Sequence, residues 1–420
     1  MTPNRRPRRV AAGGRIVAVF SAALLLSCAD PATAAVRVPG GVAPARPGGA
    51  VTVTAGEQKL PGMPPVPGPE AGQADCVPAS AVRARKQDWA RRRLDLDKIR
   101  AYGTGDGVTV AVIDTGVATR AAGLQGRVTA GDGADRDCPG HGTFVAGLVA
   151  GAAGGSPDLG GVAPHAEVLG LRGTDDLGRP DAARIASAVR AATSAGADVI
   201  TVSLALPQRD ADLSAAVAAA RRAGAVVVAA ATPDPPVGAA DPVPSRRYWP
   251  ASEPGVLSVV DMLPSGERPD GALPTPNADL AAPGAGVVSG GPRGQGSYLG
   301  SGPSLAAAFV AGTAAVVRGT HPRASADEVV RRLLSTAYPA DVAQLDTYAA
   351  VTGIPEAAAH SPQSQDPGPV RLRDTAVADR ATRRATWLAL GGAAGVVAVA
   401  WAAFALPRAR ARRWRPAGQD

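Results

Sequence analysis

The chain has 420 residues, of which 45% are hydrophobic and 3% aromatic, so it can build a large α/β core from small aliphatic side chains. Its net charge of +8 comes from the two ends, because five arginines lie in residues 1–15 and ten in residues 371–415. Without those segments and Asp420, 29 of the 44 basic and 33 of the 36 acidic residues remain. This mildly acidic body disfavours nucleic-acid binding.

Residues 1–34 have the three parts of a secretory signal peptide. The arginines precede an apolar run from Ile16 to Leu26, and Ala32-Thr33-Ala34 supplies a cleavage site of small residues. The alternative is lipid attachment at Cys28, because the preceding Leu25-Leu26-Ser27 loosely resembles a bacterial lipid-attachment box. We expect cleavage near Ala34, which places the mature chain outside the cytoplasm.

Cleavage there removes one of the three cysteines. The remaining pair, Cys76 and Cys138, enters an oxidising compartment, where disulfides form and persist. We therefore expect these two residues to be joined.

Residues 35–99 are predicted to form an N-terminal arm. Residues 36–75 are rich in proline and glycine and indicate an extended segment without a core of its own. A short helix is expected from Ala81 to Arg93, with the segment Asp88–Leu94 on the surface of the following domain.

Residues 100–350 alternate short apolar runs with helical patterns, which predicts a doubly wound, mostly parallel α/β sheet. The expected strands are 108–113, 167–171, 198–204, 226–231 and 256–261. The expected helices are one beginning at His141 and those at 181–195, 212–223, 305–320 and 326–336.

The C-terminal part is predicted to be a membrane anchor. Residues 351–386 are rich in Pro, Ser and Gln, which indicates a disordered spacer. Residues 387–406 carry no charge and are long enough to cross a membrane, although a buried helix of a soluble domain is the alternative. The basic tail, residues 407–420, then lies in the cytoplasm, with residues 36–386 on the other side.

Three polar residues stand at the ends of predicted elements. Asp114 follows a buried strand, His141 opens a helix, and Ser304 follows Gly302-Pro303 at the start of an Ala-rich helix. Functional groups in open α/β sheets gather at the carboxyl ends of the strands. We expect these three side chains to meet.

Together, the three residue types provide nucleophilic catalysis. The imidazole of His141 takes the Ser304 proton, Asp114 orients and stabilises the imidazole, and the serine oxygen attacks a carbonyl. Singly, each residue has a structural alternative, because Asp, Ser and His also cap turns and helices. The other histidines, His165, His321 and His360, lack the glycines that flank His141.

The segments AVIDTGV around Asp114, GHGTFVAG around His141 and GPSLAAAFVAG around Ser304 resemble the three signature motifs of the subtilisin-like serine proteases, in that family's order. The likeness covers roughly residues 100–340. The leader, the proline-rich arm, the sequence QDWARRRLDL and the C-terminal anchor resemble the mycosins, membrane-anchored subtilases associated with type VII secretion. This resemblance implies an arm that wraps the catalytic domain and is tied by a Cys76–Cys138 disulfide.

The chain also departs from the subtilase pattern. Thr232-Pro233 stands where the family has Gly-Asn, whose asparagine is half of the oxyanion hole. Thr232 is the candidate replacement, and Ser203 and Ala205 are the candidate residues of the substrate cleft. Pro303 replaces the usual threonine before the nucleophile. Losing an oxyanion donor costs about 10² to 10³ in rate.

The leading hypothesis is a serine endopeptidase that cleaves exported proteins or peptides at the cell membrane, linked to a type VII secretion complex. The alternative is a weak or inactive subtilase-fold subunit with a structural or regulatory role, and ester hydrolysis is a further option. No cofactor or metal is expected. The acidic group Asp132, Asp135 and Asp137 has the spacing of a solvated loop rather than that of a calcium site.

Overall fold

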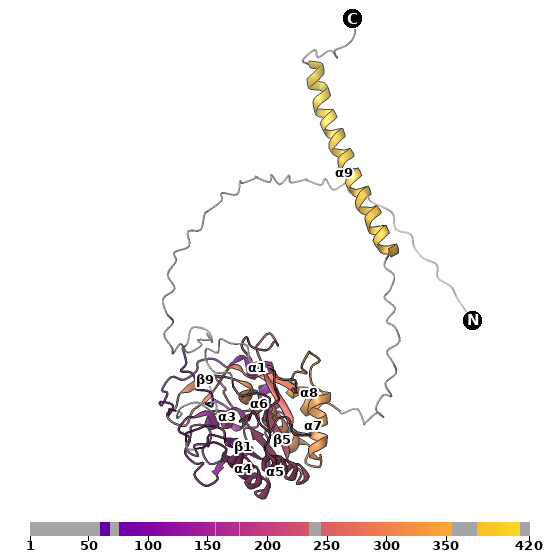
Figure 1. Cartoon of the computed structure of the whole chain (residues 1–420). Helices are drawn as coiled ribbons and strands as arrows, with labels where there is room; N and C mark the ends of the chain where they lie inside the picture. Colours follow the sequence, from indigo (N-terminus) through magenta and orange to yellow (C-terminus); the bar gives the residue numbers. More distant parts are fainter. Residues whose placement is uncertain are drawn as a thin grey trace, which may run out of the picture. The chain divides into compact units, whose positions relative to one another are not determined.

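The computed structural model describes residues 59–67, 75–155, 157–175, 177–234, 245–354 and 376–411 (Figure 1). The predicted signal peptide lies outside these residues. So do much of the arm, residues 355–375 of the spacer and the end of the basic tail.

Seven parallel strands form one sheet in the order β2-β3-β1-β4-β5-β6-β7. The strands are β1 (Thr109–Asp114), β2 (Val128–Ala130), β3 (Glu167–Arg172), β4 (Val199–Val202), β5 (Val226–Ala230), β6 (Leu257–Met262) and β7 (Leu280–Pro283). A separate antiparallel hairpin consists of β8 (Ala285–Gly290) and β9 (Ser297–Ser301). The predicted parallel α/β sheet is confirmed, whereas the short strands β2, β7, β8 and β9 were not predicted.

Helices cover both faces of this sheet. The described helices are α1 (Trp89–Arg93), α2 (Leu96–Ile99), α3 (His141–Ala150), α4 (Ala182–Ser194), α5 (Ala211–Arg222), α6 (Pro303–Thr320), α7 (Ala326–Ser335), α8 (Thr347–Thr352) and α9 (Ala376–Ala411). Helices α3 and α6 pack on one face, and α4 and α5 on the other. The sheet is therefore doubly wound, as predicted.

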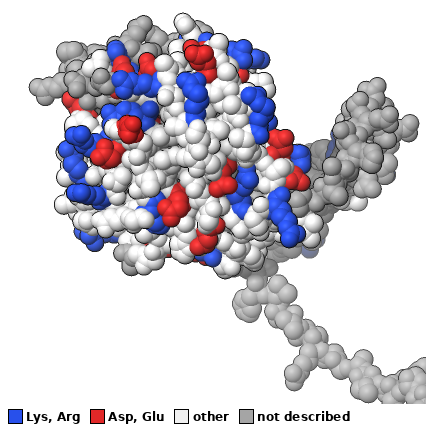
Figure 2. Space-filling view, turned by 90° about the horizontal axis from the view of Figure 1, so that it is seen from below, with Lys and Arg blue, Asp and Glu red and all other residues white. Residues whose placement is uncertain are grey.

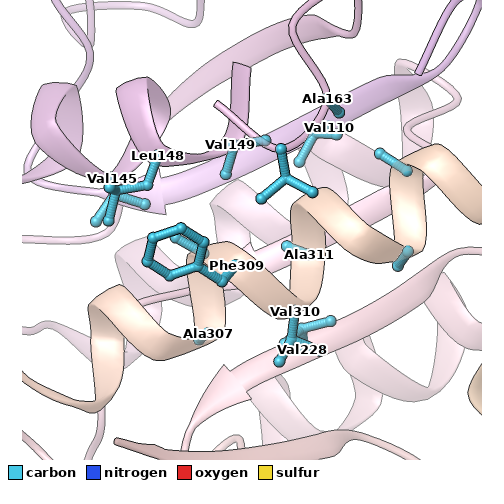
Figure 3. Packing of buried hydrophobic residues seen from close by; sticks show 14 of the residues in the cluster. Val110, Val145, Leu148, Val149, Ala163, Val228, Ala307, Phe309, Val310 and Ala311 are labelled. Atoms are coloured by element: carbon cyan, nitrogen blue, oxygen red, sulfur yellow. The ribbon is translucent and has the colours of Figure 1, made fainter. Parts of the chain in front are cut away.

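Alternation along the buried strands divides the core into two layers. In β1, Val110 and Val112 point into the cluster beneath α3 and α6, while Ala111 and Ile113 point into the cluster beneath α4 and α5. Figure 3 shows Phe309 of α6 beside the α3 side chains in the first cluster. Helix α6 is buried along almost its whole length, so its N-terminus is held firmly at the edge of the sheet.

The predicted helix at 81–93 is wrong over most of its length, because only α1 at its end is helical. The expected surface position of Asp88–Leu94 holds only in part, because four of its seven residues, Asp88, Ala90, Arg91 and Leu94, are buried. Arg91 is 1% exposed and donates to the carbonyls of Leu159, Gly160 and Val288, and it pairs with Asp88 at 2.7 Å. These backbone acceptors and one carboxylate make a charged side chain tolerable in the interior.

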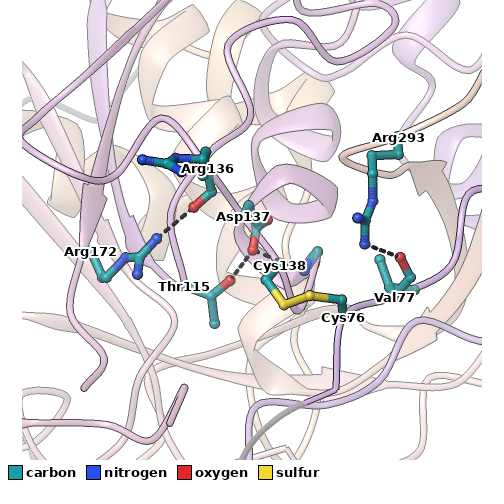
Figure 4. The surroundings of a disulfide bond; sticks show 9 residues. Cys76, Val77, Thr115, Arg136, Asp137, Cys138, Arg172 and Arg293 are labelled. Carbon is teal, nitrogen blue, oxygen red and sulfur yellow. Dashed lines mark hydrogen bonds between the residues drawn. A yellow bond between two sulfur atoms is a disulfide. The ribbon is translucent and has the colours of Figure 1, made fainter. Parts of the chain in front are cut away.

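The described parts of the arm pack against the domain. Met63 and Val77 join the main core, which agrees with an arm that has no core of its own. Cys76 and Cys138 form the predicted disulfide, with Cα atoms 4.4 Å apart. Figure 4 shows this bond next to Asp137, just before the start of α3.

Helix α9 contains one segment, Ala381–Ala411, that is long and apolar enough to cross a membrane. The helix begins and ends beyond the predicted span of 387–406. On the face of the domain in Figure 2, basic and acidic side chains are interspersed. That face lacks the single-sign patch that a nucleic-acid backbone would require.

Candidate active site

Asp114, His141 and Ser304 come from three elements that meet at one edge of the sheet. Asp114 ends β1, His141 is the first residue of α3, and Ser304 is the second residue of α6. Strand β1 pairs with β3 on one side and with β4 on the other, so the winding direction reverses here. Such reversals are where open α/β sheets bind their ligands.

The imidazole of His141 lies between the other two side chains. Its Nδ1 is 2.9 Å from both carboxylate oxygens of Asp114, and its Nε2 is 3.1 Å from Oγ of Ser304. All three residues are buried, with Asp114 and Ser304 at 0% exposure and His141 at 2%. The structure thus brings together all three predicted catalytic residues.

Close backbone packing positions the start of α3. A Cβ atom at Gly142 would lie 2.0 Å from the carbonyl oxygen of Gly116, so only glycine lets the helix approach the end of β1. Asp137 holds this turn by accepting from the N–H groups of Gly140 and Thr143. Its two oxygens also accept from the hydroxyl groups of Thr115 and Thr143.

These hydrogen bonds show that Asp137 stabilises the turn before α3. Its oxygens are engaged by donors of the chain itself. Within the described parts of the chain, no three His, Cys, Asp or Glu side chains are grouped so that they could hold a metal ion.

A fourth residue, Asp234, completes the cluster. Its Oδ2 is 2.7 Å from Oγ of Ser304 and 3.0 Å from Nε2 of His141. Its Oδ1 accepts the backbone N–H of Ser304 at 3.1 Å. The side chain is only 2% exposed, so these contacts are shielded from water.

Sequence reasoning missed Asp234. It directly follows the pair Thr232-Pro233, which aligns with the family's Gly-Asn. The available signal was the same as that for Asp114, namely a carboxylate just beyond the carboxyl end of a buried strand, here β5.

The candidate cleft residues Thr232, Ser203 and Ala205 are buried, and among the described residues none of them forms a hydrogen bond with Ser304. The hydroxyls of Thr232 and Ser203 have no hydrogen-bond partner among those residues.

Two carboxylates set the protonation of His141. Burial by itself lowers the pKa of an imidazole, but Asp114 and Asp234 outweigh burial and raise the pKa of His141 well above its usual 6.5. An imidazolium is thus favoured at neutral pH, with Nδ1 donating to Asp114 and Nε2 donating to Asp234.

A buried serine hydroxyl beside an imidazole that is held by a carboxylate defines the class of serine hydrolases. The carboxylate, base and nucleophile sit on the ends of β1, α3 and α6 of a parallel α/β sheet.

The chain belongs to the subtilase family of serine peptidases, whose family model matches residues 105–371. Mycosin-4 of Mycobacterium tuberculosis is 32% identical over 414 residues, covering 84% of this chain and 89% of the relative. Subtilisin DY of Bacillus licheniformis is 33% identical over 249 residues, covering 58% of this chain and 89% of the relative. The likeness to the mycosin thus extends beyond the catalytic domain.

A solved structure also resembles the chain in three dimensions. The MycP3 protease from the type VII (ESX-3) secretion system is 30% identical, with a TM-score of 0.57, and the match covers 72% of this chain and 99% of that protein. A second resemblance, to a chain of the periplasmic assembly of the ESX-5 inner membrane complex, has 26% identity and a TM-score of 0.59. It covers 75% of this chain and 97% of that one.

Proposed function

We propose that this protein is a membrane-anchored serine endopeptidase that cleaves exported proteins through an acyl-enzyme on Ser304. The single observation that carries the proposal is the buried imidazole of His141, held by both oxygens of Asp114 at 2.9 Å and lying 3.1 Å from Oγ of Ser304. Membership of the subtilase family supports peptide-bond cleavage over other carbonyl chemistry.

In this mechanism, neutral His141 accepts the hydroxyl proton while Oγ of Ser304 bonds to the substrate carbonyl carbon. The carbonyl electron pair moves onto oxygen beside the N-terminus of α6, where the Ser304 N–H donates. The imidazolium, stabilised by Asp114, then protonates the leaving amine. Water repeats the sequence to release the acyl group.

The proposed site of action is the outer side of a bacterial membrane. The predicted leader directs residues 36–386 outwards, and arginines follow the apolar helix. The mycosins and the ESX-5 membrane assembly among the similar proteins support a type VII secretion complex as partner. Protease added to intact spheroplasts should digest the catalytic domain, whereas protection until lysis would contradict this orientation.

A second candidate is a subtilase-fold subunit with little or no turnover. The specific observation in its favour is Asp234, which accepts from the same Ser304 N–H that would bind an oxyanion. The two candidates predict different outcomes in the same labelling experiment.

The test is covalent labelling of the full-length protein in detergent with a fluorophosphonate probe. The endopeptidase predicts slow but saturable labelling that is lost in Ser304→Ala. Folded wild-type protein that remains unlabelled throughout about pH 5 to 9 would contradict the proposal and favour the inactive subunit. Identical unfolding curves of the two proteins would control for folding.

A further inference from the structure

Asp234 gathers hydrogen bonds from every donor of the reacting group. Its Oδ2 accepts the Ser304 hydroxyl at 2.7 Å and lies 3.0 Å from Nε2 of His141, while its Oδ1 accepts the Ser304 N–H at 3.1 Å. The serine proton that the base must take therefore points to Asp234 rather than to His141. We call this arrangement, in which Asp234 accepts both the hydroxyl and the N–H of Ser304, the closed form of the site.

The backbone around the nucleophile is shaped for this carboxylate. A Cβ atom at Gly302 would lie 2.0 Å from Oδ1 of Asp234, and the φ of Gly302 is +152°. Any larger residue would push the carboxylate away from the Ser304 N–H. Gly302 and Asp234 thus fit each other at the position where a tetrahedral oxyanion needs space.

The surrounding charges couple this carboxylate to the base. His141 on α3 is the cation that pairs with Asp234 among the described residues, and Asp114 on β1 lies behind that imidazole. Asp261 on β6 is close enough to Asp234 to interact with it electrostatically, and Arg268 lies 3.4 Å from the Asp261 carboxylate. The charge of Asp234 therefore depends on the proton that it shares with His141 and on the two nearby carboxyl groups, Asp114 and Asp261.

A negative charge on Asp234 would oppose the reaction in two ways. Its Oδ1 accepts the hydrogen bond of the Ser304 N–H, which is the group that must stabilise the oxyanion. The negative charge also holds His141 as an imidazolium, which cannot accept the Ser304 proton. The neutral acid has neither effect, and a neutral carboxyl group in a buried site can donate a hydrogen bond to an oxyanion.

We propose, building on the proposed peptidase function, that Asp234 is a further catalytic residue: its carboxylate closes the site, and its neutral acid supplies the missing oxyanion donor. Moving one proton from Nε2 of His141 to Asp234 converts the closed form into the competent form without uptake from solvent. His141 then takes the Ser304 proton as the Oγ–carbon bond forms, and the carbonyl pair moves onto oxygen. Asp234 donates to that oxygen and keeps its proton.

This sharing of one proton predicts a bell-shaped pH profile. Removing the shared proton at high pH leaves a carboxylate beside the oxyanion position, and adding a second at low pH protonates the base. The two limbs belong to the His141–Asp234 pair rather than to either residue alone. A purely structural Asp234 would leave the alkaline side as a plateau, set by the base alone.

The experiment measures the rate of fluorophosphonate labelling of the full-length protein in detergent from about pH 5 to about pH 9. Wild type should give a bell, while Asp234→Asn, an amide donor of the same shape, should rise to an alkaline plateau. At the plateau the variant should react at least about tenfold faster than wild type, because one oxyanion donor is worth about 10² to 10³ in rate. Ser304→Ala added to Asp234→Asn should abolish labelling.

The outcomes separate the two proposals. Ser304-dependent labelling of wild type with an alkaline plateau, or equal rates in wild type and Asp234→Asn, overturns the role of Asp234 and leaves the peptidase standing. No labelling in either folded protein overturns both. The shape of the wild-type profile decides the question even if the variant fails to fold.

Discussion

The two halves of the site are built differently around one imidazole. On the β1–α3 side, Asp114 and His141 follow the family pattern, and Nδ1 meets a single carboxylate at 2.9 Å. On the β5–α6 side, Nε2 faces both Ser304 and a second carboxylate, Asp234. With the role proposed for Asp234, an intact nucleophile motif does not by itself determine turnover, because the charge of one additional neighbour decides whether the base is available.

Breaking the first half should have the largest effect. Asp114→Asn keeps the shape of the side chain but removes the charge that stabilises the imidazolium. We expect the labelling rate at its optimal pH to fall by about 10³ to 10⁴-fold. A loss below tenfold in the folded variant would mean that Asp114 does not support the base.

The Cys76–Cys138 disulfide ties the arm to the segment just before α3, the helix that begins with His141. Replacing Cys76 and Cys138 by serine should lower the free energy of unfolding by about 4 kcal/mol, given a sequence separation of 62 residues. Urea unfolding followed by tryptophan fluorescence measures the change. Wild type with its disulfide reduced is the control and should unfold at the same midpoint as the double variant. Equal midpoints for oxidised wild type, reduced wild type and the double variant would show that the bridge does not stabilise the folded protein.

The sequence predicted the first half well because its signals are local. A β-branched run followed by Asp114, and a glycine-flanked His141, identify element ends without any knowledge of packing. Asp234 also follows a buried strand, but its contacts with Ser304 depend on the distant Gly302, which leaves room for the carboxylate and which no local pattern reveals. The burial of Arg91 escaped prediction for the same reason, since its backbone acceptors come from residues 159, 160 and 288.

Next to the β5–α6 side lies Asp261, a buried carboxyl group whose charged form is disfavoured. Burial raises the pKa of Asp261 from 3.8 to about 6, with Arg268 opposing the rise and Asp234 adding to it. The folded state binds this proton more tightly, so the contribution of Asp261 to stability is fully present below about pH 4 and is lost as the pH rises through 6. Asp261→Asn should therefore be more stable than wild type at pH 7 by about 3 kcal/mol.

Urea unfolding at several pH values checks this prediction. The gain from Asp261→Asn should shrink as the pH falls through 6 towards 4, because wild type regains its proton there. Parallel stability curves over that range would show that Asp261 is not held against its charge.

Thr232→Val should have the smallest effect. The Thr232 hydroxyl is buried without a hydrogen-bond partner among the described residues, so its removal leaves no group unsatisfied. Labelling should stay within about twofold of wild type. A loss of about 10² would instead identify Thr232 as the oxyanion donor and would transfer to it the role assigned to Asp234.

The most direct test of the central claim is the charge of His141. Nitrogen-15 NMR of histidine side chains is tractable because the chain has four histidines, and His141→Asn identifies the signal. The account predicts that both ring nitrogens are protonated at pH 7 in wild type, and that Asp234→Asn lowers the pKa of His141. A neutral imidazole at pH 7 in wild type would contradict it.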